Sequence, residues 1–126
     1  MKSSREIEAE ISEAMRGFER LHMGYGPRNV HAHVLDDLLV VRLQEVLTKA
    51  ERHLVNNLSP EKGRDLLKQV RKHLIETSRP IIEEMIANIT GVRVLSLHYD
   101  ISTRTGEEVV LFTLTSVPQF RKIQNK

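Results

Sequence analysis

Two short turn segments constrain the fold of this chain more than any other feature: Asp36-Asp37 and Ser102–Gly106. Each turn separates two runs of strand-type residues, and the four runs are 28–35, 38–43, 92–101 and 107–115. In the first run apolar and polar residues alternate, which is the pattern of a half-buried strand. Connections of two and five residues join antiparallel neighbours, because a parallel pair needs a crossover of roughly a dozen residues. The sequence therefore predicts two β-hairpins.

Three further segments carry apolar residues at helical spacing. The first, 4–21, has one apolar stripe formed by Ile7, Ile11, Met15 or Ala14, Phe18 and Leu21. The second, 49–57, follows Thr48 and contains Glu51, so the two residues have the spacing of a capping box. In such a box the hydroxyl and the carboxylate each satisfy a free backbone N–H at the start of a helix. Ser59-Pro60 then predicts an N-cap and a first-turn proline.

The longest helical pattern covers 62–90 and contains a proline, Pro80. Its apolar residues keep one helical phase throughout, and they are Leu66, Leu67, Val70, Leu74, Ile81, Ile82, Met85, Ile86 and Ile89. A proline inside a helix costs about 3 kcal/mol, so we expect a kink there, with Thr77 or Ser78 as candidates to cap a second segment. Gly91 is expected to end the helix as its left-handed C-terminal cap.

The predicted elements follow the order α-ββ-α-α-ββ, which favours an α+β fold. We expect a four-stranded antiparallel sheet with helices packed on one face, forming one domain over 1–117, and a basic C-terminal tail over 118–126. The strand 107–115 has apolar residues on both sides, which predicts a central strand or a second face covered by a partner. Because two hairpins leave sheet edges open, a homodimer through an edge or a sheet face is expected.

Composition excludes several chemistries. The chain has no cysteine, so it forms no disulfide, no thiolate nucleophile and no cysteine-ligated metal cluster. Its formal net charge of +2 indicates no strong electrostatic field toward nucleic acid or an anionic membrane. Acidic residues interrupt the N-terminal region where a signal peptide needs an apolar run, and no window is apolar enough for a transmembrane segment. We therefore expect a cytoplasmic protein without a transmembrane segment, and we expect no cofactor.

His31-Ala32-His33 places two imidazoles on one face of the first strand, where they could share a metal ion. His98 would approach them if the first and third strands are neighbours, and His22 ends the first helix nearby. The alternative is that the pair lies on the solvent side of an amphipathic strand, because no Asp or Glu has ligand spacing with it. His31, His33 and His98 are the ligand-binding candidates, and no metal site is assigned.

The remaining motifs with possible chemistry are better explained as turns. Gly24-Tyr25-Gly26-Pro27 looks like a phosphate loop, but such loops lead from a strand into a helix, and here a helix precedes a strand. Asp36, Asp37 and Asp100 suggest a carboxylate pair for acid–base work or cation binding, yet Asp is a standard turn residue. No nucleophile elbow or triad pattern is present. We therefore assign no catalytic residue and expect no enzyme.

One face of the longest helix is predicted to be basic, and its members are Lys68, Arg71, Lys72 and Arg79. Basic stripes of this kind contact nucleic-acid phosphates. Glu76 and Glu83 lie four residues after Lys72 and Arg79, so they neutralise much of the charge. We expect a solvated helix face, with nucleic acid, an acidic protein or a membrane surface as the alternatives.

Several segments carry a family likeness, and in order they are Gly24-Tyr25-Gly26-Pro27, Asp36-Asp37-Leu38-Leu39-Val40-Val41-Arg42-Leu43, Leu47-Thr48-x-x-Glu51, Ile89-Thr90-Gly91 and Val92-x-Val94. With the second hairpin they cover about residues 6–114, and together they resemble the MpsC-like family of small bacterial proteins. The resemblance implies a soluble component of a sodium-linked, membrane-potential-generating system whose membrane partners are tied to inorganic-carbon uptake. It implies no catalytic residue. Tyr25 in the turn and the histidine-rich first strand depart from the family pattern.

Three hypotheses for function follow. The first is a non-catalytic accessory or regulatory protein that acts by protein contact, with membrane transporter subunits as candidate partners on the strength of the resemblance alone. The alternative is a sensor that binds a small ligand, an anion or a metal in a pocket between the sheet and the longest helix, near His31 and His33. A weak nucleic-acid binder is the third, and nucleic acid is not the favoured partner.

Overall fold

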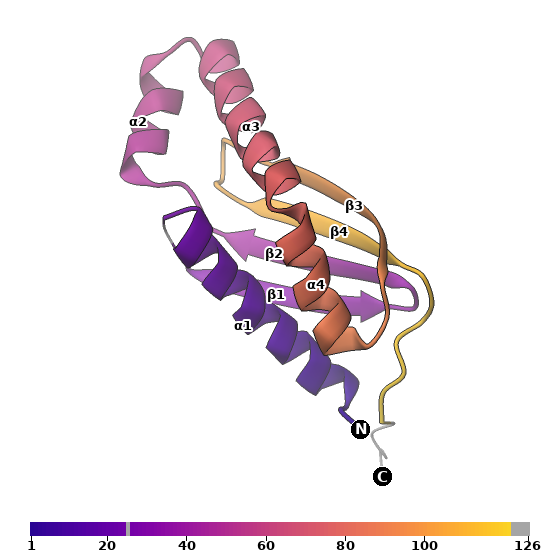
Figure 1. The fold of residues 1–126 in the computed structure, drawn as a ribbon. Coiled ribbons are helices and arrows are strands. Elements are labelled where there is room, and N and C mark those ends of the chain that lie inside the picture. The colour runs from indigo at the N-terminus through magenta and orange to yellow at the C-terminus, as the bar shows by residue number, and fades with distance from the viewer. Residues whose placement is uncertain (25, 122–126) are drawn as a thin grey trace.

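The protein is described here by a computed structural model that covers residues 1–24 and 26–121. Its elements follow the predicted order (Figure 1), and their bounds are α1 (Ser4–His22), β1 (Asn29–Leu35), β2 (Leu38–Gln44), α2 (Lys49–Asn57), α3 (Pro60–Thr77), α4 (Arg79–Thr90), β3 (Val94–Ile101) and β4 (Glu108–Leu114). The α+β class predicted from the sequence is thus confirmed. No helix in these two ranges is long and apolar enough to cross a membrane.

The four strands form one antiparallel sheet in the order β1-β2-β4-β3. Strand β4 is therefore central, as one interpretation of its two apolar sides predicted, and β1 and β3 are the two edges. Helices α1, α3 and α4 pack on one face of the sheet, and α2 packs on α3 beyond the end of the sheet (Figure 1). Side chains of β4 alternate between the core and the open face, with Val110, Phe112 and Leu114 buried under the helices.

Local signals explain where the first two helices begin. Ser3 and Glu6 form a capping box at the start of α1, with Glu6 N–H donating to Ser3 Oγ at 3.1 Å. The capping box predicted at α2 is confirmed, since Glu51 N–H donates to Thr48 Oγ1 and Thr48 N–H donates to Glu51 Oε1. Each box satisfies backbone donors that a helix leaves free at its N-terminus.

The long helical pattern around Pro80 forms two helices rather than one kinked helix. Helix α3 ends at Thr77, and Pro80 lies in the first turn of α4, where the missing N–H has no helical partner to lose. Ser78 occupies the N-cap position, but its side chain makes no capping hydrogen bond. Gly91 ends α4 with φ of 78°, which confirms the predicted left-handed cap.

The apolar residues of α3 do not share one face, contrary to the single phase expected from the sequence. Leu67 and Ile75 are buried against the sheet, whereas Leu66, Val70 and Leu74 are exposed. Neighbouring positions differ by about 100° around a helix, so a core-facing stripe and an outward-facing stripe can follow one another in the same periodic pattern. Ile81 of α4 is exposed as well.

The beginning of the expected tail packs on the domain. Pro118 is buried, and Phe120 packs against the core. Arg121 N–H donates to the carbonyl of Lys2 at 2.7 Å, so the last described residue is bonded to the N-terminal segment. Tyr25 of the expected turn and residues 122–126 of the expected tail lie outside the described residues.

Candidate functional site

The candidate histidines do not converge. His31 and His33 are exposed on β1, at one edge of the sheet, and His98 is exposed on β3, at the opposite edge. Two strands separate the edges, which at about 4.8 Å a step places His98 about 14 Å from the pair. His22 stacks on Phe18 of α1, with ring centroids 4.7 Å apart. The neighbouring-strand condition for a three-histidine site is therefore not met.

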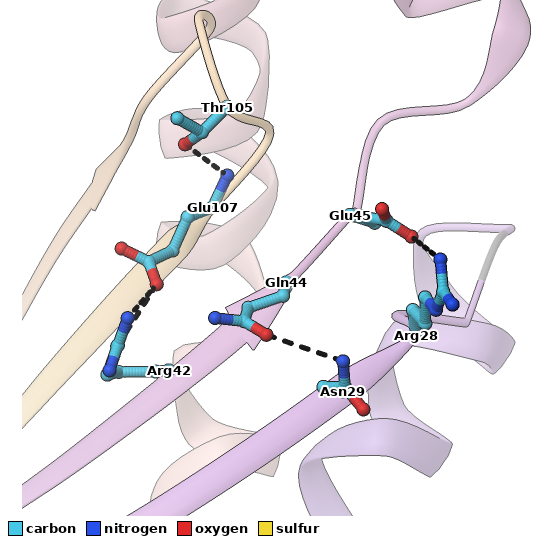
Figure 2. Close-up of a pocket in the computed structure, with 7 residues that line it drawn as sticks. All are labelled: Arg28, Asn29, Arg42, Gln44, Glu45, Thr105 and Glu107. Carbon is cyan, nitrogen blue, oxygen red and sulfur yellow. Dashed lines mark hydrogen bonds and ion pairs between the residues drawn. The ribbon is translucent and has the colours of Figure 1, made fainter.

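An open polar hollow lies at the end of the sheet where β2 ends and β4 begins. We call it the end pocket, and Figure 2 shows its lining residues Arg28, Asn29, Arg42, Gln44, Glu45, Thr105 and Glu107. Its volume is about 500 Å³. Glu45 has a left-handed backbone with φ of 57°, which turns the chain out of β2, and Val46 N–H then donates to the carbonyl of Gly106.

The charges of the end pocket are paired internally. Arg42 donates two hydrogen bonds to Oε2 of Glu107, at 2.6 and 3.0 Å, and Arg28 lies 3.5 Å from Glu45 (Figure 2). A second hollow of about 460 Å³ shares Glu107 and includes Lys68 and Asp100. Because each of these arginines already faces a carboxylate, an added anion would have to compete with a protein group.

The aspartates occupy the turns and edges that their residue type predicts. Asp36 has φ of 56° in the hairpin bend, and the carbonyl of Asp37 accepts from Leu114 N–H. Asp100 pairs with Lys68 at 3.0 Å, and this hydrogen bond holds the pKa of Asp100 below its usual value. Among the residues that the structure describes, no group of three or more His, Asp or Glu side chains gathers to hold a metal ion.

A buried polar cluster surrounds Arg71 of α3. This Arg71 network consists of Glu19, Glu51, Arg71, Tyr99 and Glu108, one residue from each of α1, α2, α3, β3 and β4. The Arg71 side chain is only 1% exposed, and those of Glu19 and Glu108 are 0% exposed. The sequence predicts a solvated face for Arg71, and this prediction is wrong because the side chain is buried.

The Arg71 guanidinium donates in three directions. Nε and Nη2 reach the two oxygens of Glu51 at 3.0 and 2.8 Å, and Nη2 also reaches the carbonyl of Val46 at 3.0 Å. Nη1 donates to Oε2 of Glu108 at 2.8 Å. Glu51 thus caps α2 and at the same time binds Arg71 of α3. Burial alone would raise the pKa of Glu51, but the hydrogen bonds from Arg71 and Thr48 hold it below its usual value.

The other two carboxyl groups of the network are poorly neutralised. Oε1 of Glu19 lies 3.5 Å from Arg71 Nη1, which is longer than a normal hydrogen bond. Burial, together with the charge of Glu108, raises the pKa of Glu19 to about 9. Burial also raises the pKa of Glu108, although Arg71 and the Tyr99 hydroxyl, which donates to Oε2 at 2.8 Å, act in the opposite direction.

The remaining basic residues of α3 and α4 are mostly paired. Lys68 binds Asp100, and Arg79 contacts Glu83 and Glu76. With Arg71 buried, the predicted basic stripe does not form one continuous cationic surface.

Sequence reasoning missed the Arg71 network, but two signals for it were present. Arg71 stands midway between Leu67 and Ile75, at four-residue spacing, so it occupies a core position of the helix. Glu108 shares strand parity with the buried residues Val110 and Phe112. A charged residue within an apolar stripe indicates a buried partner, because an unpaired charge in a protein core is costly.

Comparison with known proteins gives a family match over most of the chain. A family profile described as "Na+-translocating membrane potential-generating system (MpsC)" matches residues 3–116. The chain is also similar to the uncharacterized protein YbcI of Bacillus subtilis (strain 168), with 36% identity over 113 residues, which are 90% of this chain and 89% of that protein. No solved structure matches the chain.

Proposed function

This chain belongs to the MpsC family, and from that premise we propose that it is a non-catalytic accessory protein that acts through contacts with other proteins. The family description names a membrane-potential-generating system that translocates Na⁺, so the proposed partner is a protein component of such a system. We also propose that the protein is a homodimer and that it acts on the cytoplasmic side of the membrane.

The observation that carries the proposal is an unpartnered apolar surface on α3 and α4. We call it the apolar row, and it consists of Leu66, Val70, Leu74 and Ile81, which are 43%, 47%, 38% and 46% exposed. A shallow hollow of about 520 Å³ lies over the middle of α3, between Gln69 and Glu76. Exposed apolar side chains at helical spacing, on a helix that already buries another face, are typical of a protein–protein contact.

The open face of the sheet supports the homodimer. Across the four strands His33, Val40, Leu111 and His98 form one row, as the strand registers place them opposite one another. From either edge of the sheet, the row has the same order of residue types: histidine, apolar, apolar, histidine. A two-fold axis parallel to the strands would set Val40 of one copy against Leu111 of the other, which is the self-complementarity that a symmetric dimer requires.

A dimer formed through this face would be weak. Seven-residue strands at usual spacings give a face of about 450 Å² per copy, and the total of about 900 Å² lies below the standard interface of roughly 1,600 Å². Sedimentation measurements should therefore show self-association that depends on concentration, and Leu111→Glu should abolish it while Asn88→Glu on the exposed side of α4 leaves it unchanged. A mass of 14.5 kDa at every concentration would exclude the dimer.

The partner contact is tested by affinity capture from the membrane fraction of the source cells, with the intact chain as bait. We expect subunits of an ion-translocating membrane complex to be retained by the unaltered protein and lost with the double variant Val70→Glu, Leu74→Glu. The double variant Asn56→Glu, Asn88→Glu adds the same charge at exposed polar positions and should retain them. Equal retention by both double variants would contradict the role of the apolar row.

The end pocket favours a second candidate function, the binding of a small polar ligand. Its two arginines and two amides could recognise a carboxylate or phosphate, once Glu45 and Glu107 are displaced. A thermal-shift screen with bicarbonate, phosphate, nucleotides and divalent metals distinguishes the two functions, because a ligand stabilises the folded state by mass action. A contact protein should show no such stabilisation.

A further inference from the structure

We propose that Glu19 of α1 and Glu108 of β4 form a buried proton-binding site in which one proton is shared between the two carboxyl groups. The proton is bonded to an oxygen of Glu19, and Oε1 of Glu108 accepts the resulting hydrogen bond. Water supplies the proton, and its return to water leaves both groups as carboxylates. The site lies inside the fold, so it does not depend on the partner contact proposed above.

Hydrogen-bond accounting supports this proton. Both oxygens of Glu19 and Oε1 of Glu108 are buried and find no donor among the described side chains and backbone groups. An ionised carboxylate is an acceptor only, so two carboxylates facing each other cannot satisfy one another. A protonated carboxyl is also a donor, and one proton therefore converts two unsatisfied acceptors into a hydrogen-bonded pair.

Charge accounting leads to the same result. Arg71 brings one positive charge to three carboxyl groups, and its Nε and Nη2 are occupied by Glu51 and the Val46 carbonyl. Its Nη1 lies 2.8 Å from Glu108 but 3.5 Å from Glu19. Glu108 also receives the Tyr99 hydroxyl, and burial raises the pKa of Tyr99, which keeps that hydroxyl a donor. Glu19 is the least compensated of the three and so holds the proton.

The occupant is a proton and not a metal ion. Among the described residues, Glu19 and Glu108 alone supply free oxygens at this point, whereas hard cations such as Ca²⁺ take about six or more oxygen ligands. The guanidinium of Arg71 already lies against the same carboxyl groups and would repel a further cation. No described cluster has the three ligating side chains that a metal site needs.

The site couples protonation to the packing of α1 on the sheet. Glu19 lies in the last turns of α1 beside buried Phe18, and Glu108 begins β4. Loss of the proton leaves two buried negative charges against the same Nη1 of Arg71, and movement of Glu19 toward water would separate them. Alkaline pH should therefore loosen the C-terminal end of α1 before the rest of the domain.

Infrared spectroscopy of the full chain tests the site directly, because a protonated carboxyl has a carbonyl stretch distinct from that of a carboxylate. At neutral pH the unaltered protein should show one protonated, D₂O-sensitive carboxyl, which disappears with a midpoint near pH 9, as the pKa of Glu19 indicates. Glu19→Gln should lack this band. Glu13→Gln, at an exposed position of the same helix, should retain it.

The unaltered protein decides the question even if Glu19→Gln does not fold. A neutral-pH spectrum in which every glutamate is ionised would overturn the proposal, as would a band that persists in folded Glu19→Gln. The spectra are repeated in sodium chloride and in choline chloride at equal ionic strength. An unchanged band supports a proton site, whereas loss of the band specifically in sodium would mean that a metal cation occupies it.

Discussion

Replacing Arg71 with methionine removes the cation from the buried Arg71 network. Methionine keeps the apolar stem of the side chain but removes every hydrogen bond from Arg71 to Glu51, Glu108 and the Val46 carbonyl. Three carboxyl groups then remain without a cation, two of them fully buried. Removing one partner of a buried ion pair typically costs about 3–5 kcal/mol.

We therefore expect Arg71→Met to lower the free energy of unfolding by about 4 kcal/mol at neutral pH, out of the roughly 5–15 kcal/mol that domains possess. Urea unfolding followed by far-ultraviolet circular dichroism measures this loss. The cost should shrink on acidification. Without Arg71 the buried carboxyl groups have folded-state pKa values above those of the unfolded chain, so the folded variant binds more protons and gains stability as pH falls.

Two controls make the test specific. Lys72→Met removes the neighbouring cation from an exposed position and should change stability by less than about 0.5 kcal/mol. Adding Glu108→Gln to Arg71→Met removes a stranded charge and should recover part of the loss. A free energy of unfolding for Arg71→Met within about 1 kcal/mol of that of the unaltered chain at neutral pH would refute the reasoning. A buried carboxylate without a cation should destabilise the fold by more than this.

Substitutions at Glu19 and Gly63 test two other features of the fold. The pKa of Glu19 rises from 4.5 to about 9 on folding, so its contribution to stability is complete below pH 4.5 and is lost as pH rises toward 9. In this range the free energy of unfolding, measured with urea, should fall by about 1.4 kcal/mol per pH unit because of Glu19. Glu19→Gln should remove this pH dependence, and an unaltered dependence would contradict the shift. A Cβ at Gly63 would lie 3.0 Å from Val55 Cα and 3.2 Å from the Leu54 carbonyl, so Gly63→Ala should push α2 from α3 and cost about 1–3 kcal/mol. Gly17→Ala, with open space around it, should instead be neutral or stabilising by up to about 1 kcal/mol; equal thermal shifts for both variants would exclude this contact.

Local structure was predictable because its causes lie close together in the sequence. The capping box of Thr48 and Glu51, the left-handed cap at Gly91 and the hairpin bend at Asp36 depend on hydrogen bonds or backbone angles within a few residues. The central position of β4 was also accessible, since apolar residues on both sides of a strand require neighbours on both sides. The break at Ser78 was predicted only as a kink, because local signals do not decide how far a proline-containing pattern bends.

The sequence by itself determined the type of each element and the order of the elements along the chain, and hence the fold class. Only the tertiary structure decided what lies opposite each face. It placed His98 at the far edge from His31, left Val70 uncovered, and brought Glu19, Arg71 and Glu108 together although they are 37 or more residues apart. Periodicity is a property of one element, whereas the pairing of a charge depends on the packing of several elements in space.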